Sequence, residues 1–290
     1  MQMINKAEDY RSDINPSWCK GCTFYSVLQA VTSVLAKNQI SPRDITVISG
    51  IGCSSRMPLY LKTNGMHTLH GRAIPVAIGA RLGRPDIPVM VIGGDGDLFS
   101  IGIGHFIHAA HKNFDMTVIC LDNQMYAMTK NQVSPTSFKG QPGTLCPGGK
   151  LTDALSGLQC AISSGATFVA RTSASLQAQM LNIISGALEH KGFSYVEITA
   201  PCRTYGSAIL KPGINSFVDV NNELNHNPAD KTGAMKLLSD SGDESYKKIL
   251  TGIFWKKIAP VYEDLLNGQN NQVSLQNVSE ILDTMIDSIQ

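Results

Sequence analysis

The stretch Val89-Met90-Val91-Ile92-Gly93-Gly94-Asp95-Gly96-Asp97 runs from apolar residues into a loop of glycine and aspartate. The apolar part predicts a buried strand over 89–92, and the segment 101–112 predicts a helix. The loop between them lets backbone N–H groups and the amino end of the helix face a phosphate, while Asp95 offers a carboxylate. The stretch therefore predicts a strand, loop and helix with a phosphate-bearing ligand at the carboxyl end of the strand.

Outward from this unit, short apolar runs alternate with longer helical stretches. We predict further strands at 45–48, 116–121, 167–170 and 193–198. We predict further helices at 23–35, 74–82, 152–164 and 175–190. The alternation predicts an α/β fold, in which a parallel sheet carries helices on both faces.

The chain becomes more polar from about Lys211. We predict two helices in this part, at 229–238 and 246–266. We therefore divide the chain into an α/β domain over 1–210 and a C-terminal extension over 211–290. The extension is expected to pack on the core or on a partner subunit.

The composition limits the kinds of partner. The 290 residues include 24 Lys plus Arg and 23 Asp plus Glu, and charged residues make up 16%, against about a quarter in typical soluble domains. This shortage favours a subunit with buried flanks. The net charge of +1 provides no overall field for nucleic acid or an anionic membrane, and no segment reaches the roughly 20 apolar residues of a membrane span. We expect no nucleic-acid or membrane partner and a cytoplasmic location, which the odd number of seven cysteines also favours.

A second polar loop, Asp122-Asn123, ends the next predicted strand. One β-α-β step can bring the amide oxygen of Asn123 beside Asp95. Mg²⁺ prefers oxygen ligands and commonly shares them between protein side chains and a phosphate. The two loops together predict a magnesium and phosphate site, and the alternative is that each loop is an ordinary turn.

Four cysteines form a second candidate site. Cys19 and Cys22 have the two-residue gap that lets two thiolates bind one metal centre, and Cys53 and Cys202 each lie just beyond a predicted strand. Four thiolates fit either a [4Fe–4S] cluster or tetrahedral zinc. The alternative is that Cys53 and Cys202 are small core residues. Cys120 and Cys160 are interpreted as core, and Cys146 stays unassigned.

Gly94-Asp95-Gly96 and Asn123 resemble the thiamine diphosphate motif, in which Asp, Asn and a main-chain carbonyl hold magnesium on the diphosphate. The resemblance implies that the Mg²⁺ ligands are Asp95, Asn123 and the carbonyl of Met125. Where that family often has Asn-Asn, this chain has Asp122-Asn123. Of this pair, only Asn123 therefore matches the motif and is expected to bind Mg²⁺.

With the cysteines included, the chain resembles the β subunit of 2-oxoacid:ferredoxin oxidoreductases over 18–205. The matching stretches are Trp18-Cys19-Lys20-Gly21-Cys22, Gly50-Ile51-Gly52-Cys53-Ser54-Ser55-Arg56, His67-Thr68-Leu69-His70-Gly71-Arg72-Ala73, Gly93-Gly94-Asp95-Gly96-Asp97, Leu121-Asp122-Asn123-Gln124-Met125-Tyr126, Ser134-Pro135-Thr136-Ser137 and Pro201-Cys202. The resemblance implies that one [4Fe–4S] cluster is held by Cys19, Cys22, Cys53 and Cys202. It also implies that thiamine diphosphate is lined by Ile51, Gly52, Cys53, Ser54, His70, Gly96, Asp97, Ala127 and Met128. Where relatives often carry Gly before Gln132, this chain has Asn131, which tolerates the positive φ of the same turn.

The resemblance implies an activity as well. A 2-oxoacid is decarboxylated oxidatively, coenzyme A takes the acyl group, and electrons pass through the cluster to ferredoxin. An α subunit is the implied partner and supplies the carboxylate that activates the thiamine. The segment 226–235 resembles 2-oxoglutarate-type β subunits, so we expect 2-oxoglutarate, with pyruvate or a broad range of 2-oxoacids as the alternative.

Two residues are candidates for catalysis. Arg56 lies three residues after Cys53, and its guanidinium can hold a substrate carboxylate bidentately. The alternative is a surface arginine with a local partner. His70, which the resemblance puts beside the cofactor, is the second candidate. Two other functions stay open: a non-oxidative thiamine decarboxylase or carboligase with incidental cysteines, and a zinc-bound structural subunit.

Overall fold

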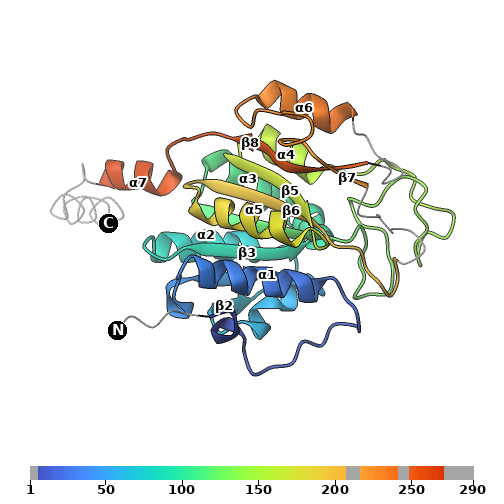
Figure 1. Ribbon diagram of the computed structural model, residues 1–290, viewed down its shortest axis with the longest axis horizontal. Coiled ribbons are helices and arrows are strands. Elements are labelled where there is room, and N and C mark those ends of the chain that lie inside the picture. Colours follow the sequence, from blue (N-terminus) through green and yellow to red (C-terminus); the bar gives the residue numbers. More distant parts are fainter. Residues whose placement is uncertain (1–5, 207–215, 241–247, 271–290) are drawn as a thin grey trace, which may run out of the picture.

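The computed structural model describes residues 6–206, 216–240 and 248–270 (Figure 1). Within these residues the strands form one sheet in the order β2-β1-β3-β4-β6-β5-β8-β7. Their bounds are β1 (Thr46–Ser49), β2 (Asn64–His67), β3 (Val89–Gly94), β4 (Met116–Asp122), β5 (Phe168–Ser173), β6 (Phe193–Thr199), β7 (Phe217–Asp219) and β8 (Ile249–Lys256). All neighbouring strands run parallel except β5 and β8. The predicted α/β fold with a mostly parallel sheet is confirmed.

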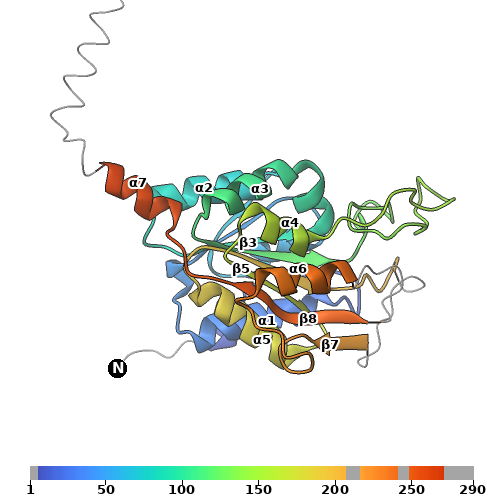
Figure 2. The ribbon, with the colours of Figure 1, turned by 90° about the horizontal axis from the view of Figure 1, so that it is seen from above.

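Helices cover both faces of the sheet (Figure 2). One face carries α1 (Phe24–Lys37) and α5 (Gln177–Glu189), which contact each other. The other carries α2 (Ala73–Gly83), α3 (Ile103–Lys112), α4 (Gly157–Ser164) and α6 (Lys231–Asp240). Short helical turns lie at Ala7–Tyr10, Pro42–Asp44 and Ser54–Tyr60, and a π-helical turn lies at Asp97–Ile101 before α3. The helix predicted from 152 begins only at Gly157, because Ser156 caps it by accepting a hydrogen bond from the Gln159 N–H.

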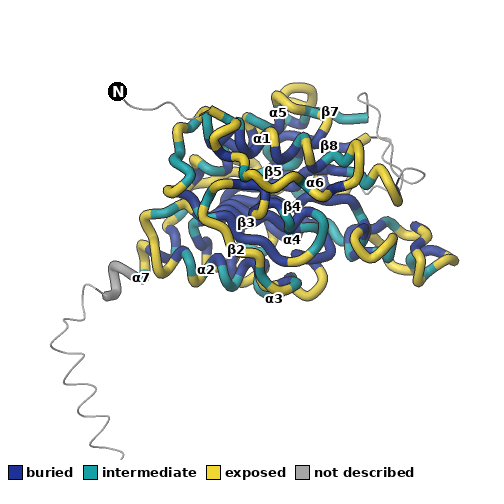
Figure 3. Tube along the Cα trace, turned by 90° about the horizontal axis from the view of Figure 1, so that it is seen from below, coloured by how far each residue is buried: buried dark blue, intermediate teal, exposed yellow. Residues whose placement is uncertain are grey.

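The central strands are buried on both sides (Figure 3). Successive side chains of a strand point to opposite faces, so Val47 belongs to the core under α1 and α5 while Ile48 belongs to the core under α2, α3 and α4. The same alternation divides Ile119 from Cys120. The continuous apolar runs of the sequence are therefore explained by burial from two sides.

The prediction of a helix over 246–266 is wrong over most of its described part, 248–266, and residues 246–247 lie outside the described residues. Residues Ile249–Lys256 form β8, and helix α7 (Tyr262–Asn270) begins only after Pro260. The β-branched and aromatic residues of β8 pair with β5, a partner far away in sequence, and this pairing overrides the local helical pattern. The strands β2 and β7 were not predicted. The division at residue 210 stays a proposal, and the extension contributes β7 and β8 to the sheet.

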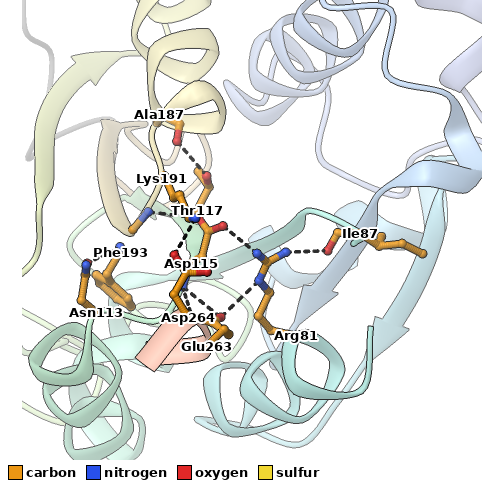
Figure 4. Close-up of polar contacts among 11 residues, drawn as sticks. Arg81, Ile87, Asn113, Asp115, Thr117, Ala187, Lys191, Phe193, Glu263 and Asp264 are labelled. Atoms are coloured by element: carbon orange, nitrogen blue, oxygen red, sulfur yellow. Dashed lines mark hydrogen bonds and ion pairs between the residues drawn. The ribbon is translucent and has the colours of Figure 1, made fainter. Parts of the chain in front are cut away.

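Helix α7 is joined to the core by buried ion pairs (Figure 4). The guanidinium of Arg81, on α2, lies 2.6 Å from Asp115 Oδ2 through Nη2 and 3.1 Å from Glu263 Oε1 through Nε. The Asp115 N–H also donates to Glu263 Oε1 over 3.1 Å. Because Glu263 is on α7, this cluster ties the end of the described chain to the beginning of β4. No helix in the described part of the chain has the length and apolar character needed to cross a membrane.

Candidate functional site

The loops that follow β1, β2, β3 and β4 meet at the carboxyl edge of the sheet and enclose one cavity. All the residues predicted to line the cofactor or hold Mg²⁺ line this cavity, namely Ile51, Gly52, Cys53, Ser54, His70, Asp95, Gly96, Asp97, Asn123, Met125, Ala127 and Met128. Gly94, Tyr126 and Thr129 line it too. Four loops thus contribute to one site, because the carboxyl ends of parallel strands share an edge.

Asp95 lines this cavity and is 1% exposed. Burial raises the pKa of its carboxyl to about 6, although hydrogen bonds from Ser134 and Thr136 lower it in part. Burial also raises the pKa of Asp122, and the neighbouring charge of Asp95 adds to that rise. Burial therefore disfavours the charged form of both carboxyls, and a bound cation would favour the charged form of Asp95.

Asn123 is held in a tight turn at the end of β4. Its Oδ1 accepts the Met125 N–H over 3.1 Å, and Gln124 between them has a φ of 56°. The carbonyl of Gln124 accepts hydrogen bonds from Ser137 Oγ at 2.6 Å and Gln141 Nε2 at 2.8 Å. The turn that presents the predicted Mg²⁺ ligands is thus fixed from outside by the following loop.

Two glycines of the site pack so closely against other side chains that a Cβ would not fit. A Cβ on Gly96 would lie 2.3 Å from the Tyr126 ring, and a Cβ on Gly50 would lie 2.1 Å from Asp97 Oδ2. Both distances are far below van der Waals contact. The glycines of the two loops are therefore required by close packing of the site.

The four predicted cluster cysteines line a second cavity, together with Trp18 and Arg56. The two cavities share Cys53, Asn123, Ala127 and Met128, so they are adjacent. In the part of the chain that the structure describes, no three His, Cys, Asp or Glu side chains form a ready-made metal site. The thiols therefore face a common cavity without the close grouping of a loaded metal centre.

The thiols nevertheless influence one another. The pKa of Cys22 is raised to about 11, chiefly by burial and to a smaller extent by the charges of Cys202, Cys53 and Cys19. Burial and the charge of Cys202 also raise the pKa of Cys53, which Arg56 lowers in part. The Trp18 Nε1–H donates to the Cys53 carbonyl over 2.7 Å and so fixes the loop that follows β1.

Arg56 lies in the cysteine cavity and not in the cofactor cavity. Its guanidinium donates a hydrogen bond to Ser17 Oγ. Arg56 thus has the local partner of the alternative interpretation while still lining a cavity beside the predicted reaction centre.

The sequence did not predict a role for Thr136 at the site. In the structure Thr136 Oγ1 is within hydrogen-bonding distance of Asp95 Oδ2 and Asp122 Oδ1, at 2.8 and 2.9 Å. The loop that carries it, between β4 and α4, extends from the sheet edge (Figure 2). The signal was the stretch Ser134-Pro135-Thr136-Ser137, whose small polar residues suit a turn near a polar site. Within that loop, Asn131 has the positive φ expected for it, 73°.

Residues 50–198 match the thiamine pyrophosphate enzyme family, C-terminal TPP binding domain. The β subunit of 2-oxoacid:ferredoxin oxidoreductase 1 from Aeropyrum pernix is 33% identical over 279 residues, which cover 92% of this chain and 86% of that protein. The chain belongs to the family of 2-oxoacid:ferredoxin oxidoreductase β subunits. It is an enzyme subunit with a thiamine diphosphate-binding domain, and the resemblance noted in the sequence is confirmed.

Other members of this β-subunit family are named for 2-oxoglutarate. The 2-oxoglutarate synthase subunit KorB of Methanocaldococcus jannaschii is 42% identical over 188 residues, covering 65% of this chain and 70% of that protein. The solved structure of a 2-oxoglutarate:ferredoxin oxidoreductase from Magnetococcus marinus, with 2-oxoglutarate, coenzyme A and succinyl-CoA bound, has 37% identity and a TM-score of 0.85. The match covers 92% of this chain and 90% of that one. Membership of this family favours an oxidoreductase over the non-oxidative and zinc-bound alternatives.

Proposed function

We propose that this β subunit, together with an α subunit, oxidises 2-oxoglutarate with coenzyme A to succinyl-CoA and CO₂ and passes the electrons to ferredoxin. The observation that carries the proposal is the convergence of the predicted cofactor residues on one cavity, directly beside a second cavity lined by four cysteines. The 2-oxoglutarate-linked relatives support the choice of substrate. Pyruvate or a broad range of 2-oxoacids is the alternative, and a cytoplasmic location stays a prediction.

The cofactor cavity fits magnesium and a diphosphate. Asp95 is a buried carboxylate, and Asn123 and the carbonyl of Met125 are oxygen donors on the same tight turn. These are hard ligands of the kind Mg²⁺ takes while it keeps positions for phosphate oxygens. When bound, thiamine diphosphate supplies the carbanion chemistry at the 2-oxo carbon. We propose that Asp95, Asn123 and Met125 hold the metal ion.

The cysteine cavity fits a metal centre with thiolate ligands. Gly21 lies between Cys19 and Cys22 in the chain and has a φ of 77°. The turn at Gly21 lets both cysteines line the same cavity as Cys53 and Cys202. Metal ligation requires thiolates. Burial and, to a smaller extent, repulsion from the other cysteines raise the pKa of Cys22, and a bound cationic centre would relieve this repulsion. We propose a [4Fe–4S] cluster on these four residues, beside the cofactor that it would oxidise.

The proposal is tested on the complex of this chain with its α subunit, co-expressed and purified anaerobically. The measurements are thiamine, magnesium and iron content, and ferredoxin reduction with coenzyme A and either 2-oxoglutarate or pyruvate. We expect bound thiamine diphosphate, a brown protein and faster reduction with 2-oxoglutarate. A colourless complex with one zinc, or one that releases CO₂ without reducing ferredoxin, would overturn the proposal. Faster reduction with pyruvate would overturn the substrate assignment alone.

A further inference from the structure

Asp97 makes an unusual set of contacts at the wall of the cofactor cavity. It is 2% exposed, and its Oδ1 accepts the backbone N–H groups of Ile51 at 3.0 Å and Gly71 at 2.8 Å. The same oxygen lies 2.7 Å from His70 Nδ1. Because this oxygen already accepts two N–H bonds, it meets the ring as an acceptor, and His70 Nδ1 is the donor.

The other carboxylate oxygen cannot substitute for this one. Among the described residues, Asp97 Oδ2 is buried and has no hydrogen-bond partner, and it packs against Gly50, where a Cβ would approach within 2.1 Å. The carboxylate is thus held in one orientation by two backbone donors on one side and a glycine on the other. Because the Asp97 carboxylate has a fixed orientation, it also fixes the His70 ring that is hydrogen-bonded to it.

His70 is far more exposed than Asp97 at the cofactor cavity. Its side chain is 33% exposed, it lines the cavity, and Tyr126 meets it edge to face with ring centroids 6.1 Å apart. A neutral imidazole that donates through Nδ1 leaves Nε2 as its acceptor. The exposed ring can then accept a proton through Nε2 from a group bound in the cavity and return it.

We propose that Asp97 is a positioning residue, which holds His70 in the Nδ1–H form so that Nε2 acts as the proton acceptor at the bound cofactor or substrate. This inference rests on the proposed function, since it requires a ligand in the same cavity. When Nε2 takes the proton, the imidazolium lies directly beside the Asp97 carboxylate, which stabilises its charge. The Asp97 carboxylate does not take up a proton in this step.

The test is a double-mutant cycle on the assembled complex with Asp97→Asn, His70→Gln and both together. The Asp97→Asn change keeps the shape of the side chain but removes its charge, and charge-assisted hydrogen bonds are about twice as strong as neutral ones. We expect kcat to fall about 100-fold for His70→Gln and at least about tenfold for Asp97→Asn, within the usual range for acid–base groups. In the His70→Gln background, Asp97→Asn should cause no further loss of kcat.

Gly50→Ala gives a second variant that moves the Asp97 carboxylate without changing any charge. Gly79→Ala is the matched control, because a Cβ there meets nothing within 4 Å. Gly50→Ala should lower kcat in the wild-type background and leave it unchanged in the His70→Gln background, while Gly79→Ala should have no effect in either. For Asp97→Asn, the dissociation constant of thiamine diphosphate with Mg²⁺, measured by calorimetry, should stay within about threefold of wild type.

The possible outcomes separate the two proposals. A wild-type complex that binds no thiamine diphosphate or turns over no 2-oxoacid would overturn the proposed function. An active wild-type complex in which the losses from Asp97→Asn and His70→Gln multiply would overturn the positioning role alone. So would an Asp97→Asn variant that loses cofactor affinity in step with kcat, since that result would show a structural role.

Discussion

The hydroxyl oxygen of Thr136 lies 2.8 Å from Oδ2 of Asp95, a residue that lines the cofactor cavity. The same hydroxyl lies 2.9 Å from Asp122 Oδ1, so it stands between two buried carboxyls. A hydroxyl hydrogen makes one hydrogen bond at a time, so Thr136 donates to either Asp95 or Asp122 at any moment. The proposed metal ligand depends on a residue that belongs to a different loop.

Replacing Thr136 with Val should weaken binding of thiamine diphosphate with Mg²⁺. The change keeps the shape of the side chain and removes the hydroxyl, and a hydrogen bond to a charged group contributes about 1.5–3 kcal/mol. We expect the dissociation constant, measured by calorimetry, to rise about 10- to 100-fold. Thr136→Ser is the control and should bind nearly as the wild type does. Equal affinities for the Val and Ser variants would show that the hydroxyl does not position Asp95.

Binding of Mg²⁺ and thiamine diphosphate should weaken as the pH falls below about 6. Burial raises the pKa of Asp95 to about 6, so protons compete with the metal ion for this carboxylate at lower pH. Calorimetry at pH 5, 6 and 7 measures the change, and a constant affinity over this range would contradict the prediction.

The stability of the metal-free protein should show the opposite pH dependence. Between the ordinary pKa of 3.8 and the folded value of about 6, the folded chain binds more protons at Asp95 than the unfolded chain. This contribution to the free energy of unfolding is therefore present at pH 4 and is lost as the pH rises through 6. Urea unfolding of the wild type and Asp95→Asn isolates it, because the variant should lack this part of the pH dependence.

The sequence predicted the centre of the sheet because burial there leaves a local pattern. β3 is a continuous apolar run, and the loop that follows it carries Asp95 and Asp97, so strand and site could be found together. β2 is exposed along its whole length, and no apolar run marks it. β8 is determined by its pairing with β5, and the role of Thr136 depends on a contact across 41 residues. Neither relationship leaves a periodic signal in its own segment.

Replacing Cys22 or Cys202 with Ser should abolish the proposed cluster. Both residues line the cavity that also contains Cys19 and Cys53, and a [4Fe–4S] cluster needs all four thiolates. We expect the iron content and brown colour of the anaerobic complex to fall close to zero. Cys160→Ser, on α4, is the matched control and should keep the iron. Full iron content in the Cys22 or Cys202 variant would show that these cysteines do not hold the cluster.

Replacing Arg56 with Ala should raise the KM for the 2-oxoacid. A guanidinium bonded to a substrate carboxylate contributes about 1.5–3 kcal/mol, so KM should rise about 10- to 100-fold in ferredoxin-reduction assays. Arg43→Ala, in the turn Pro42–Asp44, is the control and should leave KM unchanged. If Arg56 only donates a hydrogen bond to Ser17, the Arg56 and Arg43 variants should have the same KM. That result would show that Arg56 does not bind the substrate.

Replacing Arg81 with Met should destabilise the protein through loss of the α7 attachment. The guanidinium side chain is 10% exposed and bonds the carboxylates of Asp115 and Glu263, so its removal leaves two carboxylates close together with little water. Breaking a buried ion pair in this way costs about 3–5 kcal/mol, which urea unfolding measures. Arg84→Met is the matched control, because the ion pair of Arg84 with Asp86 has side chains that are 66% and 62% exposed, and it should unfold as the wild type does. Equal stabilities for the two variants would show that the cluster does not hold α7 to the core.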